Sequence, residues 1–318
     1  MDLSDRPQQE AMSPATARER CDAVLAALGE VVLDKAHQNR LVLACILARG
    51  HLLIEDLPGM GKTVLAHALA TTLGLAFNRV QFTSDLLPGD LLGCAVFDRD
   101  SGSFRFHEGP VFTQVLLADE INRASPKTQS ALLEAMEERQ VSAEGSTRPL
   151  PAVFFVIATQ NPLDQHGVHP LPEAQLDRFL MRVSLGYPSP TAELALLAGE
   201  DRRSVLARRP PLLGATDLAA LQRAATSLTA TPALLAYIHA LLAETRQSGQ
   251  FRHGLSPRAG QALLAAARAW ALIDGRDHVV PSDVQTVLPA VAAHRLQPTR
   301  GETSERLLAR LIETVALP

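Results

Sequence analysis

Short apolar segments alternate with longer helical stretches along most of this chain. We predict strands at 51–55, 78–82, 115–118 and 153–158. Apolar side chains spaced three and four residues apart predict helices at 16–29, 39–48, 62–73 and 126–139. Buried strands separated by helices are typical of a parallel sheet covered on both faces. The pattern therefore predicts an α/β fold.

Two regions interrupt this alternation, and a third ends it. Segment 85–105 is rich in Gly, Asp and Pro, and segment 141–151 has the pattern of a hairpin that turns at Glu144-Gly145. We expect both to be exposed insertions. No strand is predicted after 187–190, and residues 215–318 are rich in Ala and Leu at helical spacing. We therefore predict a flexible tail at 1–15, an α/β domain at 16–188 and an all-helical domain at 189–318.

Composition narrows the class of protein. The chain has 318 residues, of which 47% are hydrophobic and 20% charged, as expected for globular domains with a real core. Its net charge of −4 makes nucleic acid an unlikely partner, because nucleic-acid binders usually carry a basic surface. Three widely spaced cysteines indicate neither a disulfide framework nor a metal site. We find no signal peptide and no membrane span, and we expect a cytoplasmic protein.

The segment DLPGMGKT at 56–63 predicts a phosphate-binding loop between a strand and a helix. Gly59 and Gly61 let backbone N–H groups face phosphate oxygens, and the following helix adds the positive end of its dipole. Lys62 is one of only three lysines in a chain with 27 arginines. Arginine would not fit the space that a lysine ammonium occupies beside the β- and γ-phosphates, which explains its retention. Thr63 would offer its hydroxyl to Mg²⁺.

We expect seven residues of this segment to contact ATP. They are Pro58, Gly59, Met60, Gly61, Lys62, Thr63 and Val64. The strict pattern G-x-x-x-x-G-K-[ST] has glycine where this chain has Asp56. The departure weakens the motif taken alone and leaves the rate of hydrolysis open.

Two further strand ends carry candidate catalytic groups. Asp119 and Glu120 end the apolar run at 115–118, where parallel sheets bind ligands. We expect Asp119 to hold Mg²⁺ and Glu120 to activate the attacking water. Asn161 follows the next strand and could reach the γ-phosphate, although an Asn-Pro turn is an alternative.

Two arginines are weaker candidates from the sequence alone. Arg178 closes a short helical stretch and could stabilise transition-state charge, in its own chain or a neighbouring one. Arg258 begins a helix capped by Ser256 and could report the nucleotide state to the helical domain. Surface ion pairs are the alternative for both.

In this order, the candidate residues resemble an AAA+ ATPase, a P-loop NTPase with a parallel sheet and a helical lid domain, and the match is closer to the MoxR family. The segments that carry the resemblance are QFTSDLLPGD at 81–90, GPVF at 109–112, LADEINRASPKTQSALLEAMEE at 117–138, IATQNP at 157–162, LPEAQLDRF at 171–179 and LSPRAGQALL at 255–264. The resemblance covers residues 20–318. It implies Walker A and Walker B motifs at the phosphate loop and at Asp119-Glu120. It also implies sensor 1 at Asn161, an arginine finger at Arg178 that acts on the next subunit, and sensor 2 at Arg258.

The resemblance further implies a homo-oligomer, usually a hexameric ring, that remodels a partner protein with a von Willebrand factor A domain. Two other hypotheses stay open. One is a nucleotide-gated assembly module with little turnover, and the other is a subunit of a chelatase or a nucleic-acid motor. The sequence does not identify the partner.

Overall fold

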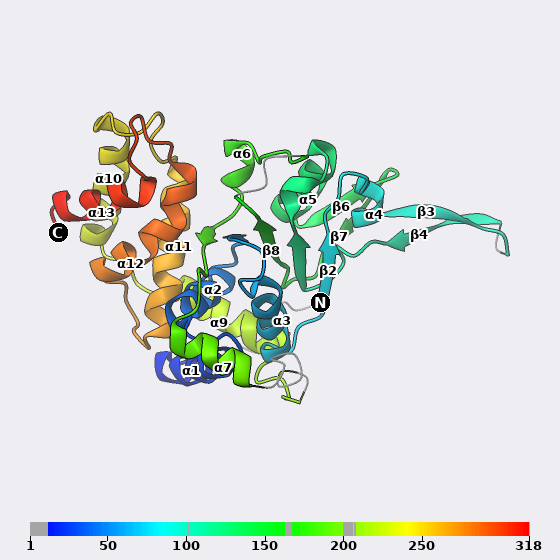
Figure 1. The fold of residues 1–318 in the computed structure, drawn as a ribbon, viewed down its shortest axis with the longest axis horizontal. Helices are drawn as coiled ribbons and strands as arrows, with labels where there is room; N and C mark the ends of the chain where they lie inside the picture. The colour runs from blue at the N-terminus through cyan, green and yellow to red at the C-terminus, as the bar shows by residue number, and fades with distance from the viewer. Residues whose placement is uncertain (1–11, 101, 163–166, 200–205, 207, 318) are drawn as a thin grey trace, which may run out of the picture.

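A five-stranded parallel sheet forms the centre of the computed structural model, which describes residues 12–100, 102–162, 167–199, 206 and 208–317 (Figure 1). Its strands lie in the order β2-β5-β8-β1-β9. Their bounds are β2 Phe77–Gln81, β5 Val115–Asp119, β8 Phe155–Gln160, β1 Leu52–Glu55 and β9 Met181–Val183. The predicted α/β class is confirmed. β9, only three residues long, escaped prediction.

Successive residues of the central strands face two different hydrophobic cores. On β5, Val115 and Leu117 belong to one core, whereas Leu116 and Ala118 belong to the other. All four side chains are fully buried. The sheet is therefore covered on both faces, which explains why its strands are apolar without alternation.

Helices cover both faces of the sheet and make up most of the C-terminal part of the chain. The bounds are α1 Pro14–Val31, α2 Ala36–Leu47, α3 Lys62–Thr72, α4 Pro88–Leu92, α5 Pro126–Glu138, α6 Glu173–Leu176, α7 Pro190–Ala198, α9 Ala215–Ser227, α10 Pro232–Gln247, α11 Pro257–Ile273, α12 Pro281–Ala292 and α13 Ser304–Thr314. Short 3₁₀ turns follow β5 (η1, Ile121–Arg123) and α12 (η2, Ala293–Arg295). Helix α11 packs against α1, α2, α9 and α12, so the C-terminal helices and the N-terminal helices share one core.

The two irregular regions are both antiparallel hairpins. The predicted hairpin forms from β6 (Gln140–Ala143) and β7 (Ser146–Pro149), with Glu144 and Gly145 at positive φ. Segment 85–105 contains α4 and most of a second hairpin, β3 (Gly93–Asp98) and β4 (Ser103–Glu108), which projects away from the body in Figure 1. The sequence predicted an insertion there but not its strands.

Several element ends differ from the predictions. Helix α1 passes through Gly29, which was expected to end it, because Val31 is still buried against the core. It also begins at Pro14, inside the expected tail, of which residues 1–11 lie outside the described part. Strand β8 begins at Phe155 rather than at 153 and continues to Gln160. Within the described ranges, no helix combines the length and apolarity that crossing a membrane requires.

Candidate functional site

The phosphate loop connects β1 to α3 at the carboxyl edge of the sheet. Gly59 and Gly61 have φ of +83° and +85°, a region where a side chain would strain the backbone. A Cβ added at either glycine would meet nothing within 4 Å, so both face open space. Lys62 is the first residue of α3, and its Nζ donates to the carbonyls of Asp56 at 2.5 Å and Leu57 at 2.9 Å. The lysine ammonium is therefore held over the loop.

Asp56, which replaces the first glycine of the strict pattern, is buried. It connects the phosphate loop to the segment that directly follows β9. Its Oδ2 accepts hydrogen bonds from the backbone N–H of Leu185 at 2.6 Å and Gly186 at 2.7 Å, and from the Ser184 hydroxyl at 3.3 Å. Its Oδ1 accepts from the N–H of Leu57 at 3.0 Å. A glycine could form none of these bonds. The departure from the pattern therefore supplies a contact between the phosphate loop and segment 184–186.

Asp119 ends β5 at the same edge of the sheet. Its Oδ1 accepts a hydrogen bond from the Thr159 hydroxyl at 2.6 Å, and its Oδ2 accepts from Arg79 Nη2 at 2.7 Å and Nε at 3.1 Å. The carboxylate is mostly buried, whereas the Arg79 side chain is 47% exposed. Sequence reasoning missed both partners because each lies on a different strand, about 40 residues away in the chain.

Glu120 leaves the strand in an unusual backbone conformation. Its φ of +57° is in the left-handed region, and its N–H donates to the Thr159 hydroxyl at 2.9 Å. Its Oε2 accepts from Gln81 Nε2 at 2.8 Å and from Arg123 Nη1 at 3.0 Å. Two donors therefore fix the direction of this carboxylate.

Asn161 lies between these groups. It directly follows β8, and β8 is flanked by β5 on one side and by β1 on the other. Its side chain is buried. The predicted phosphate loop, acidic pair and Asn161 thus come together at one edge of the sheet, where ligands of parallel sheets bind.

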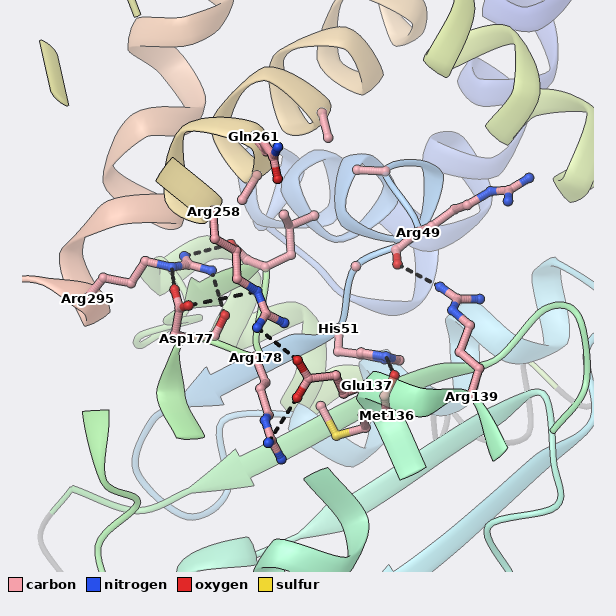
Figure 2. A pocket seen from close by; sticks show the side chains of 15 residues that line it. Arg49, His51, Met136, Glu137, Arg139, Asp177, Arg178, Arg258, Gln261 and Arg295 are labelled. Carbon is pink, nitrogen blue, oxygen red and sulfur yellow. Dashed lines mark hydrogen bonds and ion pairs between the residues drawn. The ribbon is translucent and has the colours of Figure 1, made fainter. Parts of the chain in front are cut away.

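Arg178 and Arg258 lie on the opposite side of the sheet from the phosphate loop, at the amino ends of the strands. Arg178 precedes β9, and the neighbouring Leu180 donates its N–H to the carbonyl of His51, immediately before β1. Arg258 is the second residue of α11 and lies beside Arg178 (Figure 2). Both pair with Glu137, through Arg178 Nη2 to Oε2 at 2.9 Å and Arg258 Nη1 to Oε1 at 3.1 Å. The structure therefore groups the two predicted arginines with each other and places them at the amino ends of the strands.

These arginines line a cavity of about 350 Å³ with an excess of positive charge. Its charged residues are Arg49, Arg139, Arg178, Arg258, Arg295, Glu137 and Asp177. Burial, with a smaller effect of Arg49, lowers the pKa of the Arg139 guanidinium. The Arg295 side chain is 6% exposed, and its guanidinium donates to Asp177 Oδ1 at 2.7 Å and to the carbonyl of Phe179 at 2.7 Å. Arg295 thus connects η2 of the helical part to the segment that carries Arg178. Five arginines against two carboxylates suit an anionic ligand.

His51 forms part of the same cavity wall but is neutral. Burial lowers its pKa to about 4. Its Nδ1 accepts from the N–H of Val156 at 3.0 Å, and its Nε2 lies 3.4 Å from the carbonyl of Met136. The ring therefore connects β1, β8 and the end of α5, which is a structural role.

Comparisons with known proteins identify the family of the chain. Residues 51–181 match the model of the ATPase family associated with various cellular activities (AAA), and residues 243–311 match that of the AAA lid domain. The chain is 41% identical to "Chaperone MoxR1" of Mycobacterium tuberculosis, over 88% of this chain and 78% of that protein. It is 36% identical to "Protein MoxR" of Paracoccus denitrificans, over 91% and 92%.

A solved structure from Cytophaga hutchinsonii, provisionally described as an ATPase, superposes with a TM-score of 0.86. It is 34% identical in sequence, and the match covers 96% of this chain and 97% of that one. The sheet, the phosphate loop, the helical part and these relatives lead to one assignment: the chain belongs to the MoxR family of AAA+ ATPases.

Proposed function

We propose that the chain is a Mg²⁺-dependent ATP hydrolase in which the phosphate loop binds ATP. The open φ-positive glycines, Lys62 and the start of α3 provide N–H donors and positive charge for the β- and γ-phosphates. Residues 58–64 would contact the nucleotide. This edge of the sheet holds the acidic pair and Asn161 as well.

Oxygen donors suited to Mg²⁺ lie at the same edge. Thr63 is the second residue of α3, and Asp119 ends β5 with its carboxylate already paired with the cationic Arg79. A hydroxyl and a carboxylate are the ligands that this hard cation prefers. Held by Thr63 and Asp119, Mg²⁺ would neutralise negative charge on the phosphates.

Glu120 is the residue we propose for orienting the attacking water. Gln81 and Arg123 hold its carboxylate beside the Asp119 strand end, and Asn161 leaves the adjacent strand between Asp119 and the phosphate loop. Glu120 would accept the proton of the water, and Asn161 would hydrogen-bond the water or the γ-phosphate.

The position of Arg178 and Arg258 carries the proposal of assembly. The phosphate loop lies at the carboxyl ends of the strands, whereas both arginines lie at the amino ends. A chain cannot present them to its own γ-phosphate across the sheet, but a neighbouring copy can. We therefore propose that Arg178, with Arg258 beside it, acts on ATP bound to the next subunit of a ring, and that six copies form the ring.

Remodelling of a protein partner is the proposed use of this hydrolysis. Support comes from the relative named as a chaperone and from the family resemblance, which also suggests a partner with a von Willebrand factor A domain. We also propose that the chain acts in the cytoplasm, where its cysteines would stay reduced. We propose a division at 188/189 between the nucleotide-binding and lid domains, supported by β9 as the last strand of the described ranges and by Gly186 at φ +61°.

Two variants test the proposal. Glu120→Gln should bind ATP as the natural chain does but lose at least about 90% of its turnover, because the water loses its base. Arg178→Ala should also bind ATP and lose turnover. Unchanged turnover in Glu120→Gln would refute the assignment of the base. Negligible turnover in the natural chain, with oligomers that form only in ATP, would instead favour a nucleotide-gated assembly module.

A further inference from the structure

Within the part of the chain that the structure describes, Glu137 is the one carboxylate that pairs with both Arg178 and Arg258. It lies in the last turn of α5, and each of its oxygens pairs with a different arginine (Figure 2). Its side chain is 34% exposed, against 28% for Arg178 and 51% for Arg258. The three residues come from elements far apart in the sequence.

Glu137 can also hold both arginines without using all of their N–H donors. Each guanidinium has five N–H donors, and its contact with Glu137 involves one terminal nitrogen. Arg258 has a second, looser contact, with its Nε 3.8 Å from Asp177 Oδ2. Two guanidinium groups this close repel each other, and a carboxylate between them offsets that repulsion. The remaining donors can then face an anion together.

Helix α5 explains how Glu137 reaches this position. The helix is capped by Ser125, soon after Glu120, and its 13 residues span roughly 20 Å at about 1.5 Å per residue. It begins at the carboxyl edge of the sheet and ends at the amino edge. Glu137 is therefore fixed to the same helix that follows the acidic pair.

We propose that Glu137 is a positioning residue that holds Arg178 and Arg258 side by side, ready for the γ-phosphate of ATP on a neighbouring copy. The inference rests on the proposed function, in which these arginines act between subunits. Glu137 acts through the arginines and has no contact of its own with the nucleotide. Without its charge the two guanidinium groups would separate, and their joint grip on the transition state would weaken.

Glu137→Gln tests this role with little change in shape. We expect kcat for ATP hydrolysis to fall about tenfold while KM for ATP changes less than about twofold, because the phosphate loop that binds ATP is untouched. The thermal unfolding midpoint should stay within a few degrees of that of the natural chain, since the pairs are partly exposed. Glu134→Gln is the matched control. Glu134 lies one turn earlier on α5 and is not among the residues that line the cavity, so we expect natural kinetics.

Mixing variants shows whether the defect acts between subunits. A Glu137→Gln chain has an intact phosphate loop and acidic pair, whereas a Glu120→Gln chain has intact arginines. Co-assembled, they should recover activity well above that of either variant alone, as a mixture of Arg178→Ala and Glu120→Gln should. A lower turnover in Glu137→Gln that mixing does not restore would overturn the proposal, because the defect would then lie in the chain's own site.

The outcome for Arg178 separates this inference from the proposed function. If Arg178→Ala loses turnover while Glu137→Gln keeps it within twofold, Glu137 has no positioning role and the proposed function stands. If Arg178→Ala itself keeps full turnover, action between subunits is refuted, and the role of Glu137 is refuted with it.

Discussion

The buried Asp56 carboxylate gives a stability prediction that runs against the sequence pattern. Replacing Asp56 by Ala leaves the backbone N–H groups of Leu185 and Gly186 without their acceptor, and the Ser184 hydroxyl loses one as well. A buried donor left unpaired costs roughly 1–3 kcal/mol, so two such groups give a loss of about 2–6 kcal/mol in the free energy of unfolding. Urea unfolding measures this loss, followed by the fluorescence of the single tryptophan, Trp270, which is buried in α11.

Two more variants sharpen this test. Asp56→Gly restores the glycine of the strict phosphate-loop pattern, yet we expect it to destabilise the chain at least as much as Asp56→Ala. Asp34→Asn is the control, because Asp34 Oδ2 accepts the N–H of Ser189 in the same connecting region but is fully exposed. We expect a smaller loss from the control. An Asp56→Ala chain that unfolds within about 0.5 kcal/mol of the natural one would refute the reasoning, since surface substitutions cause changes of that size.

Three further outcomes follow from the described contacts. Arg79→Ala should lower about threefold the Mg²⁺ concentration that gives half-maximal ATPase activity, because Asp119 loses a cation that competes with the metal. A higher half-maximal Mg²⁺ concentration in the variant would contradict this. Burial lowers the His51 pKa to about 4, so below the ordinary value of 6.5 the unfolded chain takes up a proton that the folded chain does not. The free energy of unfolding should therefore fall by about 2 kcal/mol from this group between pH 7 and pH 5, and urea unfolding at both pH values should show a shallower fall in His51→Gln. Gly50→Ala should destabilise the chain by about 1–3 kcal/mol, since a Cβ there would lie 2.2 Å from a buried side-chain carbon. Gly29→Ala, in open space within α1, should instead stabilise it by up to about 1 kcal/mol; equal thermal midpoints for the two would count against the packing argument.

The sheet and its carboxyl edge could be predicted from the sequence because their signals are local. Buried strands show as apolar runs, and the phosphate loop shows as glycines next to a lysine at a strand-to-helix junction. The acidic pair follows an apolar run directly. Each of these signals lies within a few residues, so no knowledge of the folded chain was needed.

The rest depended on contacts between distant segments. Thr159 looks like an ordinary strand residue until the sheet order sets it beside Asp119. Glu137 cannot be told from Glu134 or Glu138 on its own helix, because only the folded chain brings the end of α5 within ion-pair distance of Arg178 and Arg258. Asp56 looked like a defect in the motif until segment 184–186 lay beside it. Short β9 carries too few residues for its pattern to stand out.

The phosphate loop and the arginine cavity lie far apart on the chain's surface. This separation restricts the symmetry of any assembly in which one copy completes the ATP site of another. A two-fold dimer joins one patch to its own copy, so it would complete the proposed shared sites only if a single patch carried both the phosphate loop and the arginines, and these lie at opposite ends of the strands. A head-to-tail contact joins the two unlike edges and leaves one of each exposed at the ends of the assembly. An open row of copies therefore always has one fewer complete site than it has chains. If Arg178 acts on a neighbouring copy as proposed, only closure gives every chain a complete site, and turnover per chain should then rise with protein concentration and level off once rings have closed.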